Sequence, residues 1–236
     1  MSEALIAPTY SEAYELRRQF RQLYSAGAAL DYLFATVPPT GAQLEAWLAT
    51  DANLTAFQRL ISTQVGASTV CAGGAAVAAV VGSATALASL RDTDTGRIAL
   101  LNSKTAMTAL VGSATAPGVL LASAPARAAL YDHESAWALF IASVNGRNAI
   151  SAIAQEHTAS GSVAFVFPPN MGIGTRAVLV QQKASSTSLN SIAGASVDTY
   201  TTNSVTYIDR NVRVSGLCHR CGGAGVNSTI RYVVMQ

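Results

Sequence analysis

The chain has 236 residues, of which 50% are hydrophobic and 12% are charged, and its formal net charge is +2. This composition excludes general intrinsic disorder, which needs low hydrophobicity and high charge. Its Lys and Arg residues form no basic stripe or run, so we expect no nucleic-acid partner. Aromatic residues make up only 7%, which predicts a thin core of small aliphatic side chains that needs neighbours.

Residues 1–52 predict a helical segment, and we expect no signal peptide because no basic region precedes an apolar one. Thr9 and Glu12 have the spacing of a capping box and begin a helix, which Pro38-Pro39 ends. Thr40 begins a second helix with an apolar face made of Leu44, Trp47 and Leu48. This face either closes the end of the following region or anchors the chain in a larger assembly, and both interpretations stay open.

A ten-residue repeat fills residues 53–152. Counted from Asn53, position one is mostly a helix-capping residue, position four is always small, and position eight is always large and apolar. The position-four residues are Ala56, Gly66, Ala76, Ala86, Gly96, Ala106, Ala116, Ala126, Ala136 and Gly146. The position-eight residues are Leu60, Val70, Val80, Leu90, Leu100, Leu110, Leu120, Leu130, Phe140 and Ile150.

The repeat predicts a stack of short helices. Positions four and eight lie on one helical face, but a continuous helix would rotate that face by about −80° in every ten residues. We therefore expect helices of one or two turns, separated by turns near positions ten and one. Pro117 and Pro125 then fall in first helical turns, where proline removes no hydrogen bond. A β-solenoid is the alternative, but its period-two alternation is not seen.

The same region raises the questions of membrane insertion and self-association. No charged residue lies between Arg59 and Arg91, and this uncharged segment is long enough for a membrane helix. Its frequent Ser, Thr and Gly residues argue against a membrane span. Each unit buries little by itself, so stability must come from stacking. We expect the remaining apolar edge to be covered by copies of the chain in a homotrimer, with the ten position-eight residues as the oligomer core.

Three units carry a resemblance to known proteins. SKTAMTALVG at 103–112, VGSATALASL at 81–90 and VGSATAPGVL at 111–120 resemble the Ser-x-x-Ala-Met-x-Ala-Val decapeptide arrays of bacteriophage tail-fibre and minor structural proteins. LRDTDTGRIA and YDHESAWALF depart from this pattern. The resemblance implies a component of the virion, located in the tail or a fibre and made in the host cytoplasm. It also implies tail or baseplate proteins as partners.

Residues 153–236 change to β-branched and aromatic runs and predict a small antiparallel β-sandwich. Two loops, at 168–176 and 184–203, are where receptor contacts would lie. The segment YIDRNVRVSGLCHRCGGAG, followed by TIRYVV, also resembles the terminal β domain of phage fibre proteins. The fold class is thus α+β, with N-terminal helices, a repeat stack and a C-terminal sandwich. The expected strands are 163–167, 177–182, 204–208, 211–215 and 229–234.

One cluster of reactive side chains stands out, Cys218-His219-Arg220-Cys221. The alternatives are a disulfide between Cys218 and Cys221, two packed thiols, and a zinc site completed by His157, by His133 or by another subunit. Structural zinc needs four ligands, so thiols without metal are favoured and no cofactor is expected. His133 occupies position one of its unit and is expected to cap a helix.

Templates for catalysis are missing from the sequence. It contains no G-x-S-x-G elbow, phosphate-binding loop, H-E-x-x-H pair or strand–GxGxxG–helix unit, so we expect no catalytic residues and no enzyme activity. The leading hypothesis is a phage virion structural protein, tail-fibre or baseplate-associated, that self-associates through its repeats. The alternatives are a module that binds a host surface glycan or receptor, and a head or collar fibre.

Overall fold

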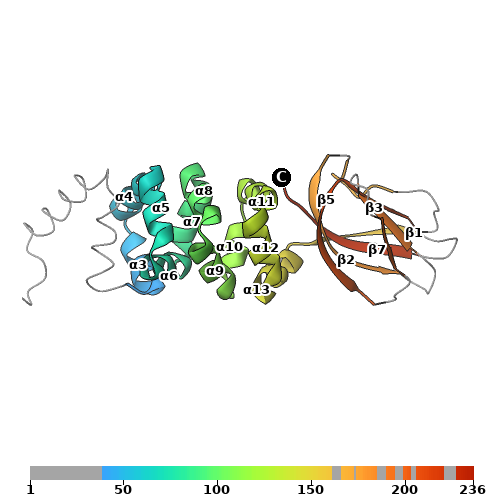
Figure 1. Ribbon diagram of the computed structural model, residues 1–236, viewed down its shortest axis with the longest axis horizontal. Helices are drawn as coiled ribbons and strands as arrows, with labels where there is room; N and C mark the ends of the chain where they lie inside the picture. Colours follow the sequence, from blue (N-terminus) through green and yellow to red (C-terminus); the bar gives the residue numbers. More distant parts are fainter. Residues whose placement is uncertain are drawn as a thin grey trace, which may run out of the picture. The chain divides into compact units, whose positions relative to one another are not determined.

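The structure is a computed structural model that describes residues 39–160, 166–172, 174–184, 190–194, 199–202, 206–220 and 227–236 (Figure 1). The expected helix beginning at Thr9 lies outside these residues. The α+β class is confirmed, since short helices are followed by antiparallel strands. Contacts divide the chain after Ala116 into two compact units, and this division falls inside the repeat region.

The N-terminal unit contains a stack of short helices, as the repeat predicts, but each helix has 8–11 residues, or two to three turns, and not one or two. Each helix packs against the next one and against the third helix further along the chain, so that α3 contacts α6, α4 contacts α7, α5 contacts α8 and α6 contacts α9. Residues about thirty apart in sequence are therefore neighbours. The helices are α3 (Gly41–Leu48), α4 (Asp51–Ile61), α5 (Gln64–Ala72), α6 (Gly74–Val81), α7 (Ala84–Asp92), α8 (Asp94–Asn102) and α9 (Lys104–Gly112).

The C-terminal unit continues with α10 (Ala116–Leu121), α11 (Ala124–Asp132), α12 (Glu134–Ala142) and α13 (Val144–Ala152), of which α12 packs against both α11 and α13. Pro117 and Pro125 are each the second residue of a helix, as expected. The helix that contains Pro117 has only six residues. The backbone N–H groups of Thr115 and Ala116, which precede Pro117, donate to the hydroxyl of Ser113.

Position one of the repeat caps the helices. The side chains of Thr63, Ser83, Ser103 and Ser143 each accept a hydrogen bond from the backbone N–H of position four. His133 does the same through Nδ1, at 3.3 Å from Ala136 N, which confirms it as a cap. Thr93 and Ser123 occupy the same place without this bond.

The first unit differs from the prediction. Thr50, not Asn53, is the N-cap of α4, and its Oγ1 accepts a hydrogen bond from the Asn53 N–H. Asn53 lies inside the helix, where its amide donates to the carbonyl of Trp47 at 2.8 Å. The helix begins earlier because Thr50 supplies the cap and Asp51 places a negative charge in the first turn.

Position four is small because consecutive helices approach each other closely there. A Cβ atom added to Gly66 would lie 2.3 Å from the Leu60 carbonyl oxygen. The corresponding distances are 2.7 Å from Gly96 to the Leu90 oxygen and 2.0 Å from Gly146 to the Phe140 oxygen. The backbone of position four therefore touches the end of the preceding helix.

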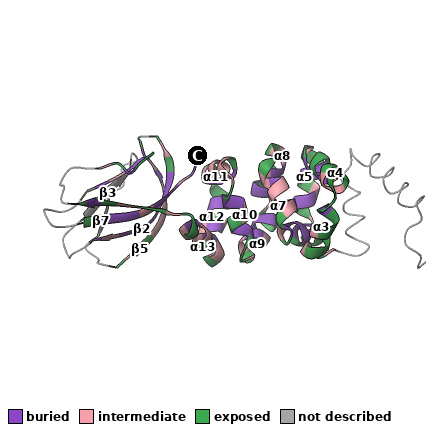
Figure 2. Cartoon of the chain, turned by 180° about the vertical axis from the view of Figure 1, so that it is seen from behind, coloured by how far each residue is buried: buried purple, intermediate pink, exposed green. Residues whose placement is uncertain are grey.

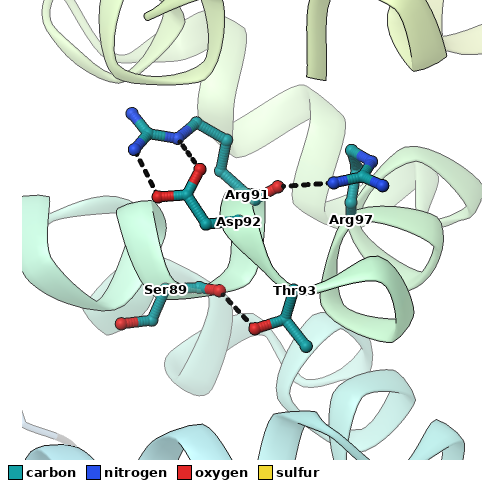
Figure 3. Close-up of polar contacts among 5 residues, drawn as sticks. All are labelled: Ser89, Arg91, Asp92, Thr93 and Arg97. Carbon is teal, nitrogen blue, oxygen red and sulfur yellow. Dashed lines mark hydrogen bonds and ion pairs between the residues drawn. The ribbon is translucent and has the colours of Figure 1, made fainter. Parts of the chain in front are cut away.

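Position five provides a second link between consecutive helices. In three units it is an arginine whose guanidinium donates to a carbonyl oxygen six residues earlier: Arg97 to Arg91 at 3.1 Å, Arg127 to Leu121 at 2.8 Å, and Arg147 to Ile141 at 2.9 Å. Figure 3 shows the first of these bonds, next to the bond from the Thr93 hydroxyl to the Ser89 carbonyl. Each arginine satisfies a carbonyl left without a partner at a helix end.

The interior of the repeat region is formed by positions four, five and eight, with apolar residues of position nine such as Ile61 and Leu121. Figure 2 shows that the helices have both buried and exposed residues. All ten position-eight residues, from Leu60 to Ile150, have 3% or less of their surface exposed within a single chain. Their burial comes from the chain's own helices, as stacking predicts.

Two antiparallel sheets form the β part, with strand orders β1-β7-β2-β5 and β4-β3-β6. The second sheet faces the first across a shared core, in which Leu217 of β6 contacts residues of β2, β5 and β7 such as Leu179, Val214 and Tyr232. The strands are β1 (Gln155–Ser160), β2 (Arg176–Ala184), β3 (Asn190–Gly194), β4 (Thr199–Thr202), β5 (Ile208–Ser215), β6 (Leu217–Arg220) and β7 (Asn227–Val234).

The predicted strands are confirmed for β2, β5 and β7, although each extends beyond the predicted bounds. Of 163–167 only Val166 and Phe167 are described, and Val166 forms an isolated bridge with His219. Of 204–208 only Ile208 lies in a described strand. The prediction of a loop at 184–203 is wrong in part, because β3 and β4 lie within this range and pair with each other.

Candidate functional site

The β part contains a chain of hydrogen bonds in its interior. His157 of β1 and His219 of β6 come from opposite sheets, and Nδ1 of His157 lies 2.7 Å from Nε2 of His219. The other nitrogen of His219 lies 2.9 Å from the hydroxyl of Ser228 on β7. His219 and Ser228 are almost fully buried, and His157 is half-buried. Burial, and then the neighbouring His157, lower the pKa of His219 to about 4, so its imidazole is neutral at neutral pH.

This arrangement matches a serine nucleophile next to a base that a second histidine orients. However, Ser228 has 1% of its surface exposed and His219 has none. A substrate carbonyl could not reach the hydroxyl without opening the sandwich, so the geometry favours a structural role.

The cysteines do not join this cluster. Cys218 directly precedes His219 on β6, and successive side chains of a strand point to opposite faces, so Cys218 faces away from His157. Cys221 lies outside the described residues, so the expected disulfide between the two is not tested. Within the described ranges no group of three or more His, Cys, Asp and Glu side chains converges on a point. His157, one of the two histidines considered for zinc, meets His219, whereas His133 caps α12.

Cys71 lies beside a groove of about 420 Å³ between α5 and α8. The groove is lined by small, polar and aliphatic side chains such as Ser68, Thr95, Ile98 and Asn102, and no charged residue lines it. Burial raises the pKa of the Cys71 thiol to about 12, so the thiol stays protonated and unreactive at neutral pH.

A row of polar residues crosses the four-stranded sheet on the face opposite the core. The strand register places Glu156, Arg231, Gln181 and Asp209 side by side. Arg231 donates to the Gln181 amide oxygen at 2.8 Å, and the Gln181 amide nitrogen donates to Asp209 at 2.6 Å. The Tyr207 hydroxyl donates to Glu156, and burial, with this bond, raises the pKa of Tyr207 to about 12. These groups satisfy one another.

A set of contacts, which we call the helix–sheet clasp, joins α11 and α12 to β5. The guanidinium of Arg213 donates to the Tyr131 carbonyl at 2.5 Å and pairs with Glu134. It also lies 5.6 Å from the ring centre of Tyr131 and 5.7 Å from that of Trp137. The Tyr131 hydroxyl donates to the Val214 carbonyl at 2.9 Å.

Two further arginines extend the clasp. Arg127 donates to the Val234 carbonyl at 3.3 Å, and Arg231 donates to the Ser151 carbonyl at the end of α13 at 2.8 Å. Two strands, β5 and β7, are thus attached to three successive helices, α11 to α13. The sandwich is fixed to the last repeats by directed bonds within one compact unit.

The loop at 168–176 presents an aromatic residue at its beginning. Phe167 has 48% of its surface exposed, whereas Met171 is buried in the core of the sandwich. The Tyr232 hydroxyl donates to the Pro169 carbonyl at 3.3 Å, and Asn170 has a positive φ of 63°. The loop is therefore held at its base and exposes Phe167.

The ten position-eight residues, which were predicted to form the oligomer core, lie in the interior of a single chain. Because the ten position-eight residues are buried inside one chain, they leave no surface for a second chain, and a contact between copies must use other residues. The large apolar side chains that are exposed on the repeat helices are Val65, Ile98 and Val144, with 52%, 58% and 61% of their surface accessible.

Comparison with models of known protein families and with curated proteins finds no match to this chain. Among the described helices, none by itself has the length and apolarity to cross a membrane. Only α5 and α6 taken together meet this criterion, and they are bent by 95° where they join.

Proposed function

We propose that the chain is a bacteriophage virion structural protein, a tail-fibre or baseplate-associated component. In this proposal the capped helices serve as a spacer and anchor, and the sandwich is the part that is presented or that docks onto another virion protein. The resemblance of the decapeptide units to phage arrays supports the phage assignment. The mechanical part of the proposal depends on the helix–sheet clasp.

The clasp supports this function because it resists separation of the sandwich from the last helices. Arg213 alone combines a carbonyl contact, an ion pair and two ring contacts. A flexible linker would let the two parts move independently, whereas several bonds spread over α11–α13 transmit a displacement of the sandwich to the repeats. Transmission of this kind is what a load-carrying virion component needs.

The first experiment asks whether the chain is part of the particle. Phage particles purified on a density gradient should contain the chain, and quantitative mass spectrometry should find a copy number divisible by three. Antibody labelling in electron micrographs would distinguish a tail position from a head or collar position. Recovery of the chain only in the soluble fraction of the lysate would contradict the proposal.

The second experiment tests self-association of the full chain. Light scattering during size-exclusion chromatography should give the mass of a homotrimer. Charged substitutions at the exposed Ile98 or Val144 should lower that mass if these residues lie in the contact, and a substitution at the exposed Ala114 is the control. A wild-type chain that stays monomeric at all concentrations would contradict self-association.

Binding of a host glycan or receptor is the second candidate, and the exposed Phe167 favours it. An aromatic ring held at the beginning of a braced loop is suited to stacking on a sugar ring or an apolar receptor surface. Wild-type protein and F167A would be compared on a glycan array and on host cells. Binding that is the same in both would remove the support that Phe167 gives.

A further inference from the structure

We propose that His157 and His219 bind a divalent transition-metal ion such as Zn²⁺ or Ni²⁺ between the two sheets of the sandwich. This inference goes beyond the proposed virion role and does not depend on it. The ion would link β1 of one sheet to β6 of the other.

The geometry of the two imidazoles supports this site. Nδ1 of His157 and Nε2 of His219 point at each other across 2.7 Å, with ring planes inclined by 73°. A tetrahedral ion with Zn–N bonds of about 2.0–2.1 Å needs two such nitrogens roughly 3.3 Å apart. The pair must therefore open by about 0.6 Å. His157 can provide this movement because it is half-buried on an edge strand.

Ser228 holds His219 in the orientation that a metal requires. Histidine ligands usually bond a neighbouring group through the nitrogen that does not bind the metal. Nδ1 of His219 lies 2.9 Å from the Ser228 hydroxyl, which leaves Nε2 for the ion. In the metal-free tautomer that leaves Nδ1–H of His219 to donate to Ser228, Nδ1–H of His157 donates to this Nε2. On binding, the proton of His157 moves to its own Nε2 through solvent, so both metal-facing nitrogens offer lone pairs and no net proton is released.

Two histidines leave open positions on the ion. Since no third His, Cys, Asp or Glu of the described residues joins the pair, water must complete the coordination shell from the side of the half-buried His157. Cys218 points to the other face of β6, so a His157–His219 site is distinct from the Cys218–Cys221 knuckle considered from the sequence. The two sites differ in the substitutions that abolish them.

Isothermal titration of the full, untagged chain with NiCl₂ and ZnCl₂ at neutral pH would test the site. The variants are S228A, the double variant C218S/C221S, and H157N. The last of these keeps a hydrogen-bonding group near His219. H133N is the matched control because it changes the histidine that caps α12. Circular dichroism would confirm that each variant is folded.

We expect one ion per chain, with affinity reduced by more than about tenfold in H157N and by roughly tenfold in S228A. H133N and C218S/C221S should bind like the wild type. No saturable binding by the wild type, equal binding by H157N, or loss of binding only in C218S/C221S would each overturn the proposal.

A second measurement uses only the wild-type chain and does not depend on variants folding. The protein has three histidines, and their Hε1 signals can be followed by NMR during addition of Zn²⁺. Two of the three signals should shift together and saturate at one equivalent. A shift of one signal, or of none, would overturn the two-histidine site.

Discussion

Replacing glycine by alanine at two helical positions should have opposite effects on stability. At Gly146 the new Cβ would lie 2.0 Å from the carbonyl oxygen and 2.9 Å from the carbonyl carbon of Phe140, so α13 must move away from α12. Overpacking of this kind costs about 1–3 kcal/mol. At Gly118 of α10 nothing lies within 4 Å of the new Cβ, and replacing a helical glycine by alanine gains roughly 0.5–1 kcal/mol.

The two variants should therefore differ by about 1.5–4 kcal/mol although the chemical change is the same. Both positions lie in the C-terminal unit, which contains Trp137, and the chain has two Trp residues. In a W47F background, fluorescence of Trp137 during urea unfolding would report on this unit alone. If G146A proved as stable as G118A, the close approach between position four and the preceding helix would be refuted.

Three further predictions concern capping, the clasp and pH. H133S should keep the cap of α12 and H133A should lose about 1 kcal/mol, measured by urea unfolding; equal stability of the two would contradict capping by His133. R213M should destabilise the C-terminal unit by about 1–3 kcal/mol, and E134Q by less than about 0.5 because Glu134 is 79% exposed in its side chain; the reverse order in thermal unfolding would argue against the clasp. Since burial lowers the pKa of His219 to about 4, the unfolded chain takes up this proton below about pH 6.5 and the folded chain does not. The unfolding free energy should therefore be highest above about pH 6.5 and should fall by roughly 1 kcal/mol per pH unit towards pH 4. An unfolding free energy that stayed constant over this range would contradict the burial of a neutral His219.

The sequence was sufficient to predict the short helices because the responsible interactions are local. A cap at position one bonds position four, three residues away, as in the pair Ser143 and Gly146. The packing of α5 on α8 was not predictable in this way. It depends on the angle of each turn, and that angle is set by contacts between helices and not by the residues of one unit.

Arginine at position five was missed because a charge in a core-facing position reads as a departure from the pattern. The relevant signal is a distance: position five lies six residues after position nine of the previous unit, where a helix ends with unsatisfied carbonyls. Arg97 and Arg147 also follow Gly96 and Gly146, where the backbones are closest. Gly-Arg at positions four and five was therefore a readable sign of this contact.

The candidate site was only partly predictable. The Cys-x-x-Cys spacing drew attention to residues 218–221, but alternation along β6 directs His219 and not Cys218 towards His157. β1 was missed because its sequence, QEHTAS, is polar and is stable as a strand only by pairing with β7 at the edge of the sheet. The meeting of His157 and His219 follows from that non-local pairing, for which one sequence contains no short-range signal.

The contact of each N-terminal helix with the third helix along gives the stack a register of thirty residues. Because each helix meets the third helix along, three decapeptides complete about one turn of the stack. Losing or gaining one decapeptide would keep this rule of contact, but it would turn the helices that follow to a different side of the stack. Losing or gaining three decapeptides would return them to the same side. Length variants that kept the direction of the following helices would therefore differ by multiples of thirty residues.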